Sequence, residues 1–300
     1  MVTISNLSAR EFVGDVIGRE TSQMLRHTPV ARLGTDPEGV HQLRVASRRL
    51  RSELRLLQPM LEPPWYATTM KELAWLGHTL GGFRDSDVLI ALLKEFATAD
   101  QSLDRAVIDR AMNDRRALQG KIVRTLSRER YALLIADLAR SVVRPPLRRA
   151  NLGPRTVVTS QLIGSWDALR TASQEVNGTE TALHQIRILA KRARYATEIA
   201  APFLGDGAHT IVERLVAIQD SLGHQRDLTA VREFVTAWYG SPEAARGVDP
   251  VDASEAWLQT VDAAGHISPD SWREPLAEAM VLIDDLDVHQ SQRPDLHQLP

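Results

Sequence analysis

The sequence predicts an all-α fold of two antiparallel, four-helix-bundle-like halves, related by a pseudo-twofold axis and separated by a basic groove. Three observations lead to this prediction. Apolar residues recur at helical spacing in nearly every long segment, and strand-like alternation is scarce. A basic motif occurs twice, half a chain apart. Prolines and glycines interrupt the pattern between Arg144 and Pro154, so we expect the halves to span residues 1–150 and 151–300.

The apolar period gives the individual helices. In the first half they are expected at 8–27, 37–61, 65–81, 84–98, 101–127 and 129–143. In the second half they are expected at 155–176, 179–203, 208–223, 225–239, 254–265 and 271–287. Asp36-Pro37 and Pro63-Pro64 are typical of helix starts, whereas Gly81-Gly82 and Gly223 are typical of helix ends. Segments without helix are expected at 240–252 and 290–300.

One face of the helix at 37–61 would carry positive charge. The side chains within an arc of about 80° on a helical wheel are those of His41, Arg44, Arg48, Arg51 and Arg55. The opposite face is apolar and predicts burial, through Leu43, Ala46, Leu50 and Leu54. Residues 40–55 hold five Arg and one Glu, a net charge of +4, and that Glu lies off the charged arc. Solvated helix faces usually interleave acids and bases, so this stripe favours an anion-binding site.

The second copy of the motif begins at His184, which follows His41 by 143 residues. Its charged arc holds His184, Arg187, Lys191 and Arg194. Residues 184–195 hold three Arg, one Lys and no acid, again a net charge of +4. Arg49 and Arg192 point away from the two arcs, and we interpret them as flank charges.

A second repeated motif follows each basic helix. Leu80-Gly81-Gly82-Phe83-Arg84-Asp85 corresponds to Leu222-Gly223-His224-Gln225-Arg226-Asp227. Since each Asp would stand at a helix start, we expect Asp85 and Asp227 to cap helices. We expect Arg84 and Arg226 to contact the anion.

The whole chain is nearly neutral, with 36 Lys and Arg against 38 Asp and Glu, a net charge of −2 and a pI near 6.5. The two basic stripes therefore indicate a local anion site rather than a broadly basic surface. The chain has no Cys, which excludes disulfides and thiolate chemistry. It shows neither a signal peptide nor an apolar stretch of membrane-spanning length, so we expect a soluble cytoplasmic protein.

The paired motifs resemble the CHAD domain, the conserved histidine α-helical domain. The resemblance covers essentially the full length and implies two helical subdomains around a basic groove that binds inorganic polyphosphate, without catalysis and without a cofactor. It leaves association with polyphosphate granules open. Placed on this sequence, it implies a binding site formed by His41, Arg44, Arg48, Arg51, Arg55, Arg84, His184, Arg187, Lys191, Arg194 and Arg226.

Three alternatives are less well supported. Nucleic-acid binding, for example to RNA, would use the same phosphate contacts, but the pI is low and the six Trp are not paired with the stripes. A histidine metal site is disfavoured because the residues three and four positions after His41 and His184 are Arg, Val or Ile, not acids or histidines. A phosphohydrolase would need clustered carboxylates for a metal ion, and the sequence has no such cluster.

Overall fold

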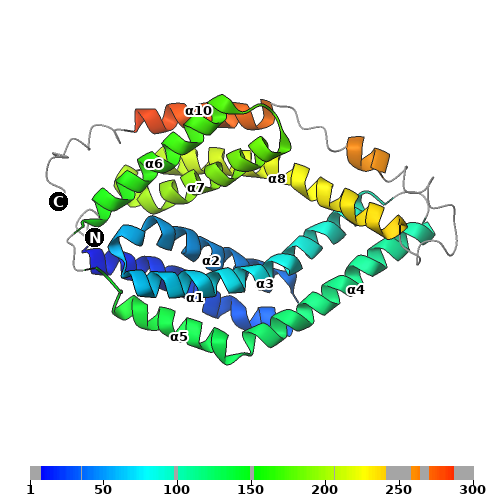
Figure 1. The fold of residues 1–300 in the computed structure, drawn as a ribbon, viewed down its shortest axis with the longest axis horizontal. Helices are drawn as coiled ribbons and strands as arrows, with labels where there is room; N and C mark the ends of the chain where they lie inside the picture. The colour runs from blue at the N-terminus through cyan, green and yellow to red at the C-terminus, as the bar shows by residue number, and fades with distance from the viewer. Residues whose placement is uncertain are drawn as a thin grey trace.

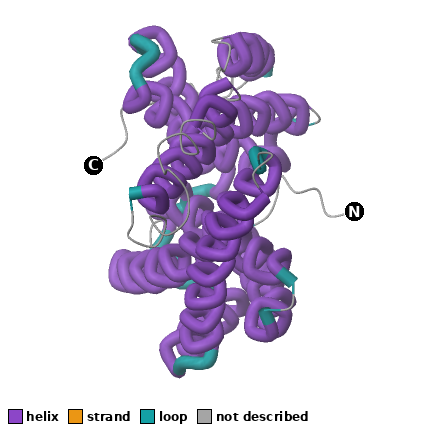
Figure 2. Tube along the Cα trace, turned by 90° about the vertical axis from the view of Figure 1, so that its right-hand side faces the viewer, coloured by secondary structure: helices purple, strands orange, loops and turns teal. Residues whose placement is uncertain are grey.

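The computed structural model describes residues 8–34, 36–97, 101–148, 152–205, 207–240, 258–263 and 270–286. Within these ranges the chain is helical throughout, apart from turns and one isolated β-bridge between Leu61 and Leu147 (Figure 2). The all-α prediction is therefore confirmed. None of the helices in these ranges combines the length and the apolar character needed to cross a membrane.

The helices fall into two groups that lie on opposite sides of the molecule (Figure 1). The first group comprises α1 (Ala9–Leu33), α2 (Pro37–Leu56), α3 (Pro63–Glu95), α4 (Gln101–Leu126) and α5 (Glu129–Val143). The second comprises α6 (Pro154–Glu175), α7 (Glu180–Leu204), α8 (Gly207–Tyr239) and α10 (Asp270–Asp285). Most packing lies within a group, but α2 contacts α7 and α3 contacts α8. α2 and α7 carry the two copies of the basic motif, and α3 and α8 carry the two copies of the glycine motif, so a twofold relation between the repeats would produce these contacts. The twofold relation and the division into two domains remain predictions.

Two long helices correct the sequence analysis. Gly81-Gly82 and Gly223 were expected to end helices, yet α3 and α8 each run through these glycines as one helix of 33 residues. Glycine in a helix interior costs only about 1 kcal/mol, which packing on both sides of the position outweighs. Leu80 and Leu222, which precede the glycines, are both buried. As a consequence, Asp85 and Asp227 lie within helices and cap nothing.

Other helix bounds differ at their ends. α1 continues to Leu33, beyond the predicted end at 27, and α2 ends at Leu56, followed by a 3-10 turn at Gln58–Met60. Residues 258–263 are helical, inside the helix expected at 254–265. The expected loop, apart from Gly240, and the expected tail at 290–300 lie outside the described residues.

Apolar contacts join the two groups of helices at two places. Phe12 of α1 and Phe203 of α7 lie with their ring centroids 5.6 Å apart, within a large buried core. A second apolar cluster joins the C-terminal ends of α3 and α8 to α4, and it includes Leu93, Val107 and Val231. Burial of this kind stabilises by about 25 cal/mol per Å² of apolar surface. These contacts fix α2 and α7 against each other.

Candidate anion-binding site

Five of the predicted site residues meet where α2 and α7 pack together. They are Arg44, Arg48, Arg187, Lys191 and Arg194, which we call the central cluster. Their charges act on one another: Arg44, Arg48, Arg187 and Arg194 all lower the pKa of Lys191, and Arg187 lowers that of Arg44. The amphipathic pattern explains the placement, because Leu43, Leu50, Ile186 and Ala190 are buried on the opposite faces of the two helices.

The remaining predicted residues extend the cluster in two directions. His41 lies near Arg84 of α3, whose charge acts on the pKa of the imidazole. In the other half, Nη1 of Arg226 lies 3.5 Å from Nδ1 of His184. Arg51 and Arg55 continue along α2, and the charge of Arg51 lowers the pKa of Arg55. The structure thus brings the predicted residues into one connected region.

The two repeated glycines lie next to guanidinium groups. A Cβ atom at Gly81 would lie 3.9 Å from Nε of Arg44, and one at Gly223 would lie 3.5 Å from Nη2 of Arg187. Each glycine follows the same leucine in its repeat. The first arginine of each basic helix therefore lies against the glycine of the neighbouring helix, at a distance where an added methyl group would make an ordinary van der Waals contact. The sequence analysis interpreted these glycines as helix ends, whereas the structure places them inside helices, next to the first arginine of each stripe.

The repeated aspartates lie beside the same arginines. Oδ1 of Asp85 is 3.6 Å from Nη2 of Arg44, and the charge of Arg187 acts on Asp227. Burial raises the pKa of Asp227, and the charge of Asp85 raises it further. The two acids of the repeat therefore lie near each other, beside Arg44 and Arg187 of the central cluster. The sequence alone suggested that no acid lies near the stripes. The structure corrects this, because Asp85 lies beside Arg44 and the charge of Arg187 acts on Asp227.

Lys191 is the base whose protonation is most affected. Burial lowers its pKa to about 7, and the charges of Arg48 and Arg187 add to this effect. Burial also lowers the pKa of His41, with a contribution from Arg84. Both shifts have the same physical meaning. Burial and the neighbouring positive charges both disfavour the protonated forms, so an anion placed beside them would favour protonation.

Acids neutralise only part of the site. Among the carboxylates that the structure describes, none forms an ion pair with Arg48, Arg187 or Lys191. The buried Nε atoms of Arg44, Arg48 and Arg51 have no hydrogen-bond partner among the described residues. A buried donor without a partner costs about 1–3 kcal/mol. A bound anion that these guanidinium groups could contact would offset that cost.

Two cavities flank the central cluster. The first, of about 690 Å³, is lined by His184, Arg187 and Arg226 together with Gln225 and Thr229. The second, of about 720 Å³, lies between α2, α6 and α7. Its basic lining residues are Arg48, Arg51, Arg55, Lys191 and Arg192. Arg192 was interpreted as a flank charge, and its place in this cavity corrects that interpretation.

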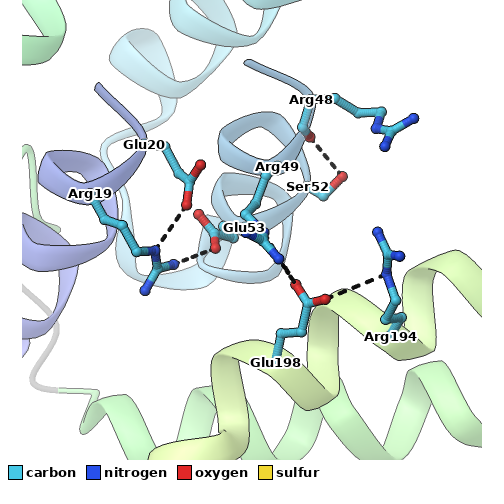
Figure 3. Close-up of polar contacts among 8 residues, drawn as sticks. All are labelled: Arg19, Glu20, Arg48, Arg49, Ser52, Glu53, Arg194 and Glu198. Atoms are coloured by element: carbon cyan, nitrogen blue, oxygen red, sulfur yellow. Dashed lines mark hydrogen bonds and ion pairs between the residues drawn. The ribbon is translucent and has the colours of Figure 1, made fainter. Parts of the chain in front are cut away.

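Arg49 makes a different contact, which Figure 3 shows. Its Nη2 and Nε lie 2.8 and 3.2 Å from Oε2 of Glu198 on α7. The other carboxylate oxygen of Glu198 is 3.5 Å from Nε of Arg194. Glu198 therefore joins α2 to α7 and also neutralises part of the central cluster. Sequence reasoning missed Glu198, because its partner Arg49 is 149 residues away.

A further network holds α2 against α1 (Figure 3). Arg19 lies 2.9 Å from Glu20 and 2.5 Å from Glu53, and both acids are buried. Burial raises the pKa of Glu53 to about 8, although the charge of Arg19 opposes this shift. These acids face away from the basic stripe, as predicted for Glu53. They act on Arg49 as well, whose pKa is raised by Glu198 despite its burial.

Two other features lie outside the predicted site. Arg115 of α4 lies 2.5 Å from Asp87 and 4.4 Å above the ring of Phe83. It therefore fastens α4 to α3. No group of three or more His, Asp or Glu suited to a metal ion occurs within the described ranges.

The fold and this site define the chain as an all-α protein in which two repeated basic helices share one cationic cluster. A family model, the CHAD domain, matches residues 15–236. The chain therefore belongs to the CHAD domain family, as its paired motifs predicted. A search of the curated proteins finds no match.

Two solved structures have the same fold. The crystal structure of the CHAD domain from the plant Ricinus communis has a TM-score of 0.77 and 23% identity, and the match covers 91% of this chain and 93% of that chain. PptA from Streptomyces chartreusis has a TM-score of 0.67 and 18% identity, and here 95% of this chain and 100% of that chain are covered. At these identities the similarity concerns the fold.

Proposed function

We propose that the chain binds inorganic polyphosphate, without catalysis, along the central cluster and its extensions. The observation that carries the proposal is the convergence of five bases from α2 and α7 on one place, of which three lack an ion pair among the described carboxylates. The family, which is linked to polyphosphate binding, supports the same ligand. The proposed contacts come from His41, Arg44, Arg48, Arg51, Arg55, Arg84, His184, Arg187, Lys191, Arg194 and Arg226.

A linear polyphosphate suits this arrangement for a physical reason. Arginine forms charge-assisted hydrogen bonds with phosphate oxygens, and each is about twice as strong as a neutral one. Bases spaced one helical turn apart meet a ligand whose charges also repeat along its length. Affinity would then come from several similar contacts, and it would fall steeply as salt rises.

Nucleic acid is a weaker candidate for the same site. Single-stranded nucleic acid usually gains affinity from bases that stack on exposed aromatic side chains. The aromatic side chain packed under the cluster is Tyr195, whose ring lies 4.8 Å from the guanidinium of Arg194 and is buried. It offers no exposed face for stacking. We therefore expect polyphosphate to displace single-stranded RNA, and RNA not to displace polyphosphate, in a competition assay.

The test reverses two charges at the centre of the site. The double variant Arg44→Glu and Arg187→Glu should lose polyphosphate binding by about 100-fold or more, since two charge-assisted contacts become repulsive. A matched control reverses Arg26 and Arg155, which are exposed, lie one in each half and line neither cavity. Titration with labelled polyphosphate and circular dichroism measure binding and helicity. Binding by the folded cluster variant at the level of the control would refute the proposal.

A second measurement concerns catalysis. The protein incubated with polyphosphate and Mg²⁺ should release no orthophosphate, because the proposed site consists of bases and lacks clustered carboxylates for a metal ion. Release that depends on Arg44 and Arg187 would show that the site is catalytic.

A further inference from the structure

The two repeats differ at one pair of equivalent positions beside the central cluster. With the offset of 143 residues that relates His41 to His184, Arg49 corresponds to Arg192, and Arg55 corresponds to Glu198. One position therefore keeps its arginine in both repeats. The other is an arginine on α2 and a glutamate on α7. In the structure each position of one helix faces the other position of its partner helix, so Arg49 lies beside Glu198 and Arg55 lies near Arg192. The two sides of the molecule therefore differ in charge.

On one side the pair is Arg49 and Glu198, and it is closed. Two guanidinium nitrogens of Arg49 lie within hydrogen-bond distance of one carboxylate oxygen. The side chain of Glu198 is 18% exposed, so little room is left for solvent around it. The positive charge of Arg49 is therefore already neutralised in the free protein. An anionic ligand would have to displace a carboxylate to reach it.

On the other side the pair is Arg55 and Arg192, and it is open. Burial lowers the pKa of Arg55, and the charges of Arg51 and Arg192 lower it further. Among the described residues, no carboxylate forms an ion pair with these three arginines. All three line the cavity of about 720 Å³ between α2, α6 and α7. The wall from α6 is uncharged and holds Ser160, Gln161 and Ser165.

We infer that Arg192, together with Arg51 and Arg55, forms an anion subsite that holds phosphate groups of a bound linear polyphosphate, and that Glu198 excludes the ligand from the equivalent place on the other side. Phosphate oxygens there take the position that the Glu198 carboxylate has opposite Arg49, since both are anionic acceptors for guanidinium. The bound chain consequently runs off-centre, from the central cluster toward α6. This inference rests on the proposed function.

The first test compares the two equivalent arginines. Arg192→Gln should weaken polyphosphate binding about tenfold and lower the slope of log affinity against log salt by about 1, as loss of one phosphate contact does. Arg49→Gln is the matched control, because its charge is already neutralised by Glu198. It should leave the slope unchanged. Equal slopes for Arg192→Gln and the wild type, or a larger loss in Arg49→Gln, would overturn the inference.

The second test fills the cavity without changing any charge. A Cβ at Gly164 of α6 meets no neighbouring atom within 4 Å, and Gly164 lines the cavity. Gly164→Phe should therefore weaken binding of long polyphosphate by about tenfold, the same loss as expected for one arginine–phosphate contact. Gly77→Phe on α3 is the control, since a Cβ there is equally free and Gly77 lines neither cavity. Wild-type affinity in Gly164→Phe would contradict the proposed path of the chain.

The outcomes separate the two proposals. If the wild-type protein does not bind polyphosphate, the proposed function fails and the subsite has no ligand. If it binds, and the double variant at Arg44 and Arg187 abolishes binding while Arg192→Gln and Gly164→Phe bind normally, the function stands and the subsite is wrong. Circular dichroism and thermal unfolding of each variant confirm that the fold is intact. Orthophosphate used as a competitor shows whether isolated phosphate groups suffice.

Discussion

Two sides of the molecule are built from the same two positions of the repeat, yet their charges differ. One side holds Arg49 and Glu198, and the other holds Arg192 and Arg55. The first side joins α2 to α7 through an ion pair with a distance of 2.8 Å. On the second side the two equivalent residues are both arginines, and they line an open cavity. A repeated fold can therefore keep the same helices in both halves and still differ in function between its two sides. Here a single charge difference, Arg55 against Glu198, leaves one side to join α2 to α7 and, by our inference, the other side to bind the ligand.

The largest effect is expected from making the open side like the closed one. Arg55→Glu places an acid opposite Arg192, as Glu198 stands opposite Arg49. It removes one phosphate contact and neutralises a second, so affinity for polyphosphate should fall about 100-fold and the salt slope by about 2. Arg55→Gln removes one contact only, so its affinity should fall about tenfold and its salt slope by about 1. Calorimetric titration at several salt concentrations measures this. Equal behaviour of the two variants would show that no new ion pair forms.

Much of this comparison was accessible from the sequence, and its decisive part was not. Helical periodicity identified the charged face of α2 and α7, because the apolar residues opposite it had to be buried. The repeat alignment, continued four residues past Arg194, would also have matched Arg55 with Glu198. That Glu198 pairs with Arg49 depends on the angle at which α2 crosses α7. Tertiary packing sets this angle, and no local pattern records it.

The glycine motif shows a second limit of sequence reasoning. Glycine is typical of helix ends, so Gly81 and Gly223 were predicted to end helices, yet both lie inside helices beside arginine side chains. Local propensity at these positions is overridden by packing between helices. The aspartates that follow were misplaced for the same reason. Once the helix is continuous, Asp85 turns toward Arg44 instead of toward a helix start.

The next prediction concerns pH and the two central bases that correspond to each other, Arg48 and Lys191. In the free protein Lys191 has a pKa of about 7, whereas arginine stays charged. A bound polyanion raises the pKa of Lys191, so above pH 7 binding takes up a proton. The affinity should therefore fall by up to about tenfold between pH 7 and pH 9, the loss of one charged contact. His41, whose pKa is lowered from 6.5, contributes only at lower pH.

Lys191→Arg distinguishes this effect from other titrations. The variant keeps the positive charge and should bind with nearly constant affinity from pH 7 to pH 9. Lys121→Arg on α4, an exposed lysine that lines neither cavity, is the control and should keep the wild-type pH dependence. Fluorescence titration of a labelled long-chain polyphosphate gives the affinities. A wild-type pH slope in Lys191→Arg would assign the proton to another group.

A smaller effect is expected from opening the closed side. Glu198→Gln leaves Arg49 and Arg194 without their acid, so both become available to phosphate. Affinity should rise about threefold to tenfold and the salt slope should increase by about 1. Arg49 is 36% exposed, so solvent limits the loss of folding free energy to about 1 kcal/mol. Thermal unfolding and salt-dependent binding measure both quantities. Weaker binding would mean that Glu198 positions Arg194 for the ligand instead of competing with it.

The smallest effect on binding is expected at the paired glycines, where the two halves are most alike. The added methyl group in Gly81→Ala or Gly223→Ala would make ordinary contacts, at 3.9 Å from Arg44 and 3.5 Å from Arg187. Each change should stabilise its helix by about 0.5–1 kcal/mol, because alanine loses less backbone freedom on folding. Affinity should change by less than about twofold, well below one charged contact. Gly81→Gln and Gly223→Gln carry longer side chains into the space of the guanidinium groups and should weaken binding. If alanine weakens binding as much as glutamine does, the arginines need the bare helix surface itself, and their position in the site is tighter than these distances indicate.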